Sequence, residues 1–372
     1  MRTALSEEFG MEIAVFAFSY MPEVVVAVTN AGGMGVLGAV RYTPDELREA
    51  LDFLDREVGG RPYGVDIVMP ATTHAVAGME LEELHATLAQ MIPQEHRDFV
   101  ERLLDEHGVP PLPAGSEPPR DLLSWTDTGA RPQVELALER PIKLLVNALG
   151  PPPRDIVEQA HAHGVKVAAL VGRTDQALKQ IEQGVDIIVA QGTEAGGHTG
   201  EVATMVLTPD VVDAVSPAPV LAAGGIGNGR QVAAALALGA AGVWTGSVWL
   251  DTVECGQPEA MYKKFHAAQA TDAVRSRAYT GKPARQLRTA WVDAWDDPAT
   301  PAPLGMPLQY MLNAEAQSRI RAAGNEQLMG TPIGQLVGSM KQTRTVLEVV
   351  DALRAEYTRT VDALPRLVPA QA

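Results

Sequence analysis

The sequence is poor in cysteine and in positive charge. Cys255 is its one cysteine, so the chain can form no intrachain disulfide and no cysteine-rich metal site. Its 30 lysines and arginines are outnumbered by 46 aspartates and glutamates, which gives a formal net charge of −16. Because such a surface repels polyanions, we expect neither nucleic acids nor anionic membranes as partners. The scarcity of cysteine is typical of a reducing compartment, and we expect a cytoplasmic protein.

Long apolar runs are also missing. No stretch reaches the roughly 18 uninterrupted apolar residues of a membrane helix. The segment MRTALSEEFGMEI lacks the basic stretch and apolar run of a secretory signal, so a soluble protein is expected. Hydrophobic residues make up 46% of the 372 residues and charged residues 20%, which is enough apolar material for a large core. A (β/α)8 barrel takes about 250 residues, so the length suits such a barrel with an additional piece.

Short apolar runs alternate with helical patterns along most of the chain, as in parallel α/β folds. Several of these runs are continuous, which is typical of strands buried on both faces. The strand candidates are residues 13–17, 35–37, 63–69, 143–146, 166–171, 186–190, 220–223 and 242–245. Eight strands are the number that a closed (β/α)8, or TIM, barrel needs. The rival, a doubly wound open sheet, would place its phosphate glycines after the first strand, whereas here glycine is dense late in the chain.

The pattern breaks twice, and the breaks divide the chain into parts. Residues 1–69 and 139–271 form the predicted barrel. Residues 70–138, after the third strand, contain helical stretches and a proline-dense part, and we interpret them as an excursion that covers the barrel mouth as a lid. Residues 272–372 are predicted to be a mainly helical second domain, a cap whose C-terminal part returns to the barrel.

Two glycine-rich loops follow the seventh and eighth predicted strands, where (β/α)8 barrels hold phosphate. The first loop, residues 224–229, opens a helix whose N-terminus favours anions. The second contains Thr245, Gly246 and Ser247, which add a glycine for close approach and two hydroxyl groups. Either loop alone could simply turn the chain. Their pairing at this place predicts a phosphate-binding site.

A histidine flanked by glycines follows the sixth strand, in the stretch QGTEAGGHTG at residues 191–200. Gly196 and Gly197 remove side-chain bulk, so the imidazole of His198 can lie against a flat ligand. An unperturbed pKa of about 6.5 suits proton transfer at neutral pH. His198 is therefore the candidate catalytic acid or base. The alternative is a structural loop histidine that caps a helix or bonds a backbone carbonyl.

Other conspicuous residues are weaker candidates. His161 and His163 lie at the end of a predicted outer helix, where they complement its dipole. Lys166 is the first residue of the fifth strand, where it either faces a cofactor or forms an ion pair at the bottom of the barrel. Trp291 and Trp295 are four residues apart on a predicted helix, a spacing that favours packing. No spacing of histidines and acids suggests a metal site.

The loop around His198, together with AGGIG at residues 223–227 and the segment at residues 242–247, resembles the nitronate monooxygenase (2-nitropropane dioxygenase-like) family. Further matching segments are NAGGMGVLGA (30–39), YGVDIVMP (63–70), GKPARQLRT (281–289) and GQLVG (334–338). The resemblance spans nearly the whole chain except residues 70–138. It implies an FMN-binding barrel, reduction of the flavin by an alkyl nitronate and its reoxidation by oxygen. A sister group with the same loop, the FMN-dependent enoyl-thioester reductases, is also similar.

Carried over to this chain, the resemblance makes His198 the catalytic residue. It implies that Gly225 and Gly227, with Gly246 and Ser247, hold the phosphate. The residues expected to bind or border FMN are Ala17, Phe18, Ser19, Asp66, Lys166, Gln191, Gly196, Gly197, Ala223, Gly224, Gly225, Gly227, Thr245, Gly246, Ser247 and Gln335.

Two departures from the family pattern concern the substrate. The family usually has Gln-Ala-Pro-Met near the first strand, whereas this chain has Ala17, Phe18, Ser19 and Tyr20. After the third strand it commonly has Gly-Val-Asn, whereas the third residue here is Asp66, a carboxylate expected to repel an anionic nitronate. Three hypotheses follow: a nitronate monooxygenase-like enzyme that uses O2, an acyl-thioester oxidoreductase, and a flavin-binding protein without turnover.

Overall fold

Eight parallel strands close into a barrel in the computed structural model, which describes residues 1–69, 81–113 and 127–364. The strands follow one another around the barrel in chain order, and the last pairs with the first. They are β1 (Val15–Ser19), β2 (Met34–Gly38), β3 (Gly64–Asp66), β4 (Leu144–Asn147), β5 (Lys166–Val171), β6 (Ile187–Gln191), β8 (Val220–Ala223) and β9 (Gly242–Thr245). The predicted (β/α)8 barrel is confirmed, and the predicted strands differ from these mainly at their ends.

The barrel interior is filled with side chains. Because side chains alternate between the two faces of a strand, every second residue points inward. Phe16, Val36, Leu144 and Val146 belong to the inner cluster. The short helix α1 (Ala4–Glu8) precedes β1, and Phe9, the next residue, meets Phe16 edge to face at a centroid distance of 5.9 Å. The N-terminal end of the barrel is thus closed by packing, which leaves the C-terminal end as the open mouth.

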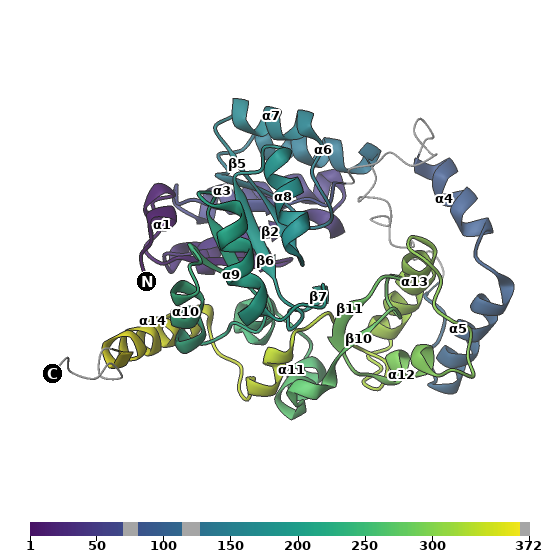
Figure 1. Cartoon of the computed structure of the whole chain (residues 1–372). Helices are drawn as coiled ribbons and strands as arrows, with labels where there is room; N and C mark the ends of the chain where they lie inside the picture. The colour runs from purple at the N-terminus through teal and green to yellow at the C-terminus, as the bar shows by residue number, and fades with distance from the viewer. Residues whose placement is uncertain (70–80, 114–126, 365–372) are drawn as a thin grey trace.

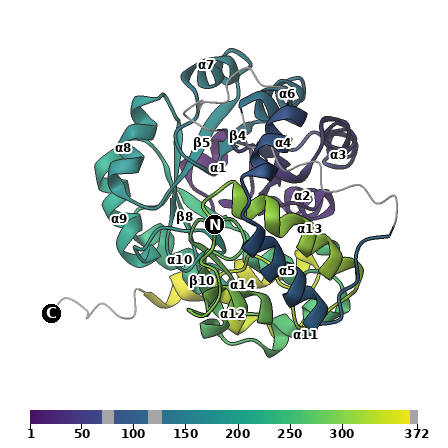
Figure 2. The same cartoon turned by 90° about the vertical axis from the view of Figure 1, so that its right-hand side faces the viewer.

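Among the described residues, eight helices surround the barrel, and Figure 2 views the molecule toward the end that carries the cap. They are α2 (Pro22–Asn30), α3 (Pro44–Glu57), α6 (Asp127–Leu138), α7 (Arg154–Ala162), α8 (Thr174–Glu182), α9 (Thr204–Val215), α10 (Gly229–Ala237) and α14 (Val346–Ala363). The last of these, α14, contacts both α10 and α2 and so completes the ring. The cap is therefore inserted between β9 and the eighth outer helix, as the excursion is inserted between β3 and α6.

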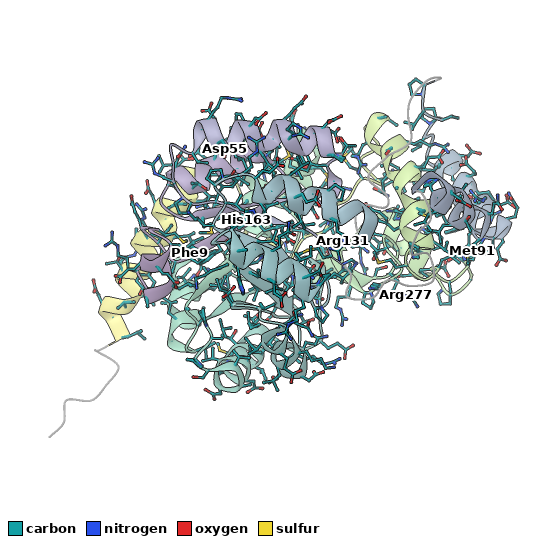
Figure 3. All side chains as sticks on the ribbon, turned by 90° about the horizontal axis from the view of Figure 1, so that it is seen from above. Phe9, Asp55, Met91, Arg131, His163 and Arg277 are labelled. Atoms are coloured by element: carbon teal, nitrogen blue, oxygen red, sulfur yellow. The ribbon has the colours of Figure 1, made fainter. Side chains whose placement is uncertain are left out.

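Both insertions pack together at one end of the barrel (Figure 1). The helices of this cap are α4 (Leu81–Gln90), α5 (Gln94–Glu106), α11 (Glu259–Ala267), α12 (Ala290–Asp296) and α13 (Leu308–Ala322). Phe99 of α5, Trp291 and Trp295 of α12 and Ile320 of α13 share one buried cluster. Seen from above in Figure 3, Phe9 lies at the barrel side of the molecule and Met91 at the far edge of the cap. The division of the chain at residues 70, 139 and 272 remains a prediction.

A small sheet, which the sequence did not predict, lies in the cap. Its strands are β10 (Ala273–Ser276), β11 (Ala284–Leu287) and β7 (Gly197–His198), and β11 is the central one. Short 3-10 helices complete the structure: η1 (Ala39–Arg41), η3 (Ser247–Asp251), η4 (Val253–Cys255), η5 (Ala270–Asp272) and η6 (Gln335–Ser339). In the described part of the chain, no helix has the length and apolar character that crossing a membrane requires.

Candidate functional site

His198 joins the barrel to the cap. It follows β6 in the chain, yet it lies on β7, which pairs with β11 of the cap sheet. Its Nε2 atom is 2.9 Å from the hydroxyl oxygen of Thr280. That hydroxyl donates its one proton to the carbonyl oxygen of Lys282, 3.2 Å away. The hydrogen-bond pattern therefore assigns the ring proton to Nε2 and leaves Nδ1 with a free lone pair.

The environment of His198 makes it a neutral imidazole. Burial disfavours the charged ring, and the nearby ammonium of Lys282 adds repulsion, so that together they lower the pKa of His198 to about 4. At neutral pH the ring can accept a proton but has none to spare as an acid. The unperturbed pKa assumed from the sequence therefore does not apply, and the base role is the one that the geometry favours.

The loop before His198 is fixed by hydrogen bonds from two sides. Glu194 accepts hydrogen bonds from the amide and the hydroxyl of Thr204, at 3.0 and 2.9 Å, and so caps the start of α9. Arg285 of β11 donates from Nε to the carbonyl oxygen of Thr193 at 2.7 Å. Gly197 has a φ of +78°, and nothing lies within 4 Å of the position where a Cβ would be. The peptide before His198 is thus open to a ligand, whereas the rest of the loop is anchored.

The structure fits a phosphate between the two predicted loops. Among the described residues, no acceptor pairs with the amides of Gly225, Ile226 and Gly246. Gly246 also has open space where a Cβ would lie. Unpaired amides around an open glycine form an anion cradle. The hydroxyl of Ser247 accepts from the amide of Gly334 at 2.8 Å, which leaves its proton free to donate.

Part of the predicted phosphate machinery is occupied by the protein itself. The amides of Gly227 and Asn228 donate to Oε1 of Gln231, at 2.8 and 3.1 Å, and the amide of Gly229 donates to Glu356 at 2.9 Å. The N-terminus of α10 is therefore already satisfied, contrary to the prediction that its free amides face the anion. A Cβ on Gly227 would collide with the Leu336 side chain, so close packing explains this glycine.

The remaining residues of these loops have mixed roles. The hydroxyl of Thr245 donates to the carbonyl oxygen of Phe16 at 3.1 Å, so it is not the free donor that the sequence suggested. Gln191 ends β6 and Ala223 ends β8, directly before the loops. Beside them, a cavity of about 540 Å³ is lined by Gly224, Gly225, Glu194, Leu336 and Gln335, among others. Gly196 packs against the backbone of residues 333 and 334.

The end of β1 forms an aromatic wall at the mouth. Phe18 points into the barrel, where its ring lies 6.3 Å from that of Trp244 and 5.0 Å from that of Tyr20. The guanidinium of Arg41 lies 4.5 Å above the Tyr20 ring. Ala17 faces the outer layer, and the Ser19 hydroxyl accepts from the amide of Met21 at 3.0 Å. Of the first-strand residues predicted to border the cofactor, Phe18 is thus the one whose side chain lies inside the barrel.

Asp66 is buried at the same mouth, as the last residue of β3. Burial alone raises its pKa from 3.8 to about 8. At neutral pH the side chain is therefore mostly an uncharged acid. The sequence suggested that a carboxylate at this position repels an anionic nitronate. An uncharged acid exerts no such repulsion.

Several predicted residues lie away from this mouth. Lys166 is the first residue of β5, at the N-terminal end of the barrel, where it forms an ion pair with Glu8 at 2.9 Å. His161 bonds Asp186 at 2.8 Å on the outer surface. Trp291 and Trp295 are buried in the cap.

Sequence reasoning missed Thr280, Lys282 and Arg285 as parts of the site. All three lie on β11 or in the loop before it, and they reach the His198 loop only because β7 pairs with β11. The segment GKPARQLRT had been noted as a family match, which was the one available signal. Within the described residues, no group of histidines, cysteines and acids could hold a metal ion.

The chain is similar to known proteins in sequence and in fold. The sequence profile of the family described as nitronate monooxygenase matches residues 16–356. A candidate monooxygenase of Mycobacterium tuberculosis is 49% identical, over 99% of this chain and 100% of that protein. The solved nitroalkane oxidase of Streptomyces ansochromogenes is 25% identical, with a TM-score of 0.78 over 96% of this chain and 99% of that one. FabK of Thermotoga maritima is also 25% identical, with a TM-score of 0.74 over 99% and 100% of the two chains.

Proposed function

The chain belongs to the nitronate monooxygenase family and is an oxidoreductase of the flavin-dependent kind, and from this premise we propose that it oxidises nitronates with FMN as its cofactor and O2 as the electron acceptor. Family membership as an enzyme sets aside the hypothesis of a flavin-binding protein without turnover. The substrate, the identity of the flavin and the role of His198 are parts of the proposal.

The observation that carries the proposal is the neutral imidazole at the mouth. His198 keeps its ring proton on Nε2, bonded to Thr280, and presents a free lone pair on Nδ1. Nδ1 takes a proton from the carbon next to the nitro group, which turns a nitroalkane into its nitronate. Because the pKa of His198 is lowered to about 4, the ring is in its base form over the whole neutral range.

The cofactor would be held by the unpaired amides of Gly225, Ile226 and Gly246 and by the free hydroxyl proton of Ser247. These four donors form one cradle, which suits the single phosphate of FMN. When bound, the flavin supplies the redox chemistry, since it takes electrons from the substrate and passes them to oxygen. The chain's part is to hold the phosphate and to close the barrel mouth with Phe18 and Tyr20.

Anaerobic mixing tests the proposal. The FMN-loaded enzyme is mixed with propyl-2-nitronate, with NADH and NADPH, and with an acyl thioester, and bleaching of the flavin is followed. We expect fast bleaching by the nitronate and none by the nucleotides. Mass spectrometry of the released cofactor should find one FMN per chain. Release of FAD, or bleaching by the other compounds but not by the nitronate, would overturn the proposal.

A second candidate is an acyl-thioester oxidoreductase. The likeness to FabK over the full length of both chains supports it. In this reaction His198 would act on the carbon next to the thioester carbonyl. The neutral ring favours removal of a proton over its donation, so the structure suits oxidation of an acyl thioester better than reduction of an unsaturated one. The thioester arm of the mixing experiment distinguishes the two candidates.

A further inference from the structure

One oxygen of the Asp66 carboxyl group has no hydrogen-bond partner among the described residues. Asp66 is 3% exposed, and its Oδ1 atom makes no hydrogen bond with any described residue. Val65 and Ile67, on either side, both pack in the cluster outside the barrel. Because neighbours on a strand point to opposite faces, Asp66 points inward. As the last residue of β3 it lies in the top layer of the interior, directly under the mouth.

Among the described residues, no charged group shifts the pKa of Asp66, which burial alone raises. Strand register places Gly38 of β2 on one side and Val146 of β4 on the other. Gly38 has no side chain, and the space beside it is filled by the rings of Phe18 and Tyr20. The titratable groups on this side are therefore Tyr20 and the guanidinium of Arg41, which lies over the Tyr20 ring.

The nearest polar side chain on β4 is already engaged. Asn147 follows Val146, and its Oδ1 accepts from the amide of Met69 at 3.0 Å. Its Nδ2 donates to the carbonyl oxygens of Met69 and Gly150, at 3.1 and 3.0 Å. Asn147 therefore fixes the chain after β3 and, among the described residues, leaves the Oδ1 atom of Asp66 without a partner. Buried polar groups are almost always paired, so an inward, unpaired one at a mouth points to a ligand.

We propose that Asp66 acts as a neutral carboxylic acid that donates a hydrogen bond to an acceptor atom on the ring of the bound flavin. The inference rests on the proposed flavin-dependent function and deepens it. Asp66 and His198 then divide the proton chemistry, since one holds a proton at neutral pH and the other holds a free lone pair. The environments of Asp66 and His198 shift their two pKa values in opposite directions, and such a pair of shifts distinguishes the acid of a site from its base.

Infrared difference spectroscopy of the apoprotein tests the protonation state without any cofactor. The carbonyl stretch of a protonated carboxyl group is separate from the carboxylate bands. Because the pKa of Asp66 is about 8, the wild-type protein should show this band near pH 6 and lose it near pH 9.5. The Asp66→Asn protein should lack the band. Asp251→Asn is the control, because Asp251 is also buried but is bonded to His266 and Thr343. This control should keep the band. Absence of the band in wild type near pH 6 would overturn the proposal.

Flavin binding tests the donor role. FMN is titrated into apoprotein between about pH 7 and 9, and quenching of flavin fluorescence gives the Kd. If the carboxylate form cannot donate, the Kd of wild type rises by up to tenfold per pH unit above a pKa of about 8. Asp66→Asn should keep a constant Kd, because an amide donates at every pH. Parallel pH profiles of the two proteins would contradict the proposal. If neither protein binds FMN at any pH while the infrared band is present, the proposed flavin function itself is wrong.

Discussion

Replacing Asp66 by asparagine should stabilise the apoprotein, by an amount that depends on pH. The folded chain holds the proton of Asp66 up to about pH 8, whereas an unfolded chain releases it near 3.8. Between these values the folded state binds more protons, so the free energy of unfolding falls as the pH rises. At 1.36 kcal/mol per pKa unit, this single group lowers the stability of wild type by up to about 4 kcal/mol at pH 7. Asparagine has nearly the same shape and carries no such cost.

Urea unfolding of apoprotein, followed by circular dichroism at several pH values, measures this effect. The stability difference between Asp66→Asn and wild type should be near zero at about pH 4, should grow through neutral pH, and should level off above about pH 8. Asp251→Asn provides the contrast, because removing a buried carboxyl that His266 and Thr343 already bond should destabilise the protein. Equal slopes of stability against pH for wild type and Asp66→Asn would refute the reasoning.

Five other changes test the rest of the site and the cap. With a nitroalkane as substrate, His198→Ala should retain flavin and lose about 10² to 10⁴-fold in turnover. Wild-type turnover should show no limb from this residue between about pH 5.5 and 7.5, since its pKa is lowered to about 4. Lys282→Met removes a repelling charge, so a rate-against-pH profile should show its acid limb moved upward. Gly246→Val should abolish FMN retention in a filtration assay while the circular dichroism spectrum stays unchanged, because the added side chain fills the open cradle. Gly227→Val should instead lower the melting temperature, since it collides with the side chain packed there. Trp295→Ala should destabilise the cap by roughly 3 to 5 kcal/mol in a denaturant titration, and unchanged stability would contradict its burial.

The barrel could be predicted from the sequence because its strands carry a strong local signal. Residues 187–190 and 220–223 are apolar on both faces, and this pattern needs no knowledge of distant residues. The cap sheet has no such signal. β11 consists of Ala-Arg-Gln-Leu, and its Arg285 and Gln286 are buried although both are polar. Its pairing with His198 joins positions more than eighty residues apart, which no local pattern reveals.

The residues of the site were easier to predict than their chemical states. His198 and Asp66 were both found from the sequence, but with the ordinary pKa values of an exposed histidine and aspartate. Burial raises the pKa of Asp66, so this group takes the charge state opposite to the one assumed, and burial lowers the pKa of His198, so its ring is neutral over a wider pH range than assumed. Likewise, the amides at the start of α10 looked free until Gln231 and Glu356 were seen to accept from them. Desolvation and long-range hydrogen bonds arise only in the folded chain.

The position of α14 has a consequence for biosynthesis. The seam between α10 and α2 is covered by a helix that the ribosome makes only after residues 247–345, the segment that includes most of the cap. Until then a nascent barrel exposes the apolar strip that Val346, Val350 and Leu353 later bury. A chain stalled within the cap segment should therefore be a target for chaperones and proteases even though all eight strands have been made. The order of synthesis thus makes residues 247–345 emerge before the barrel wall is sealed.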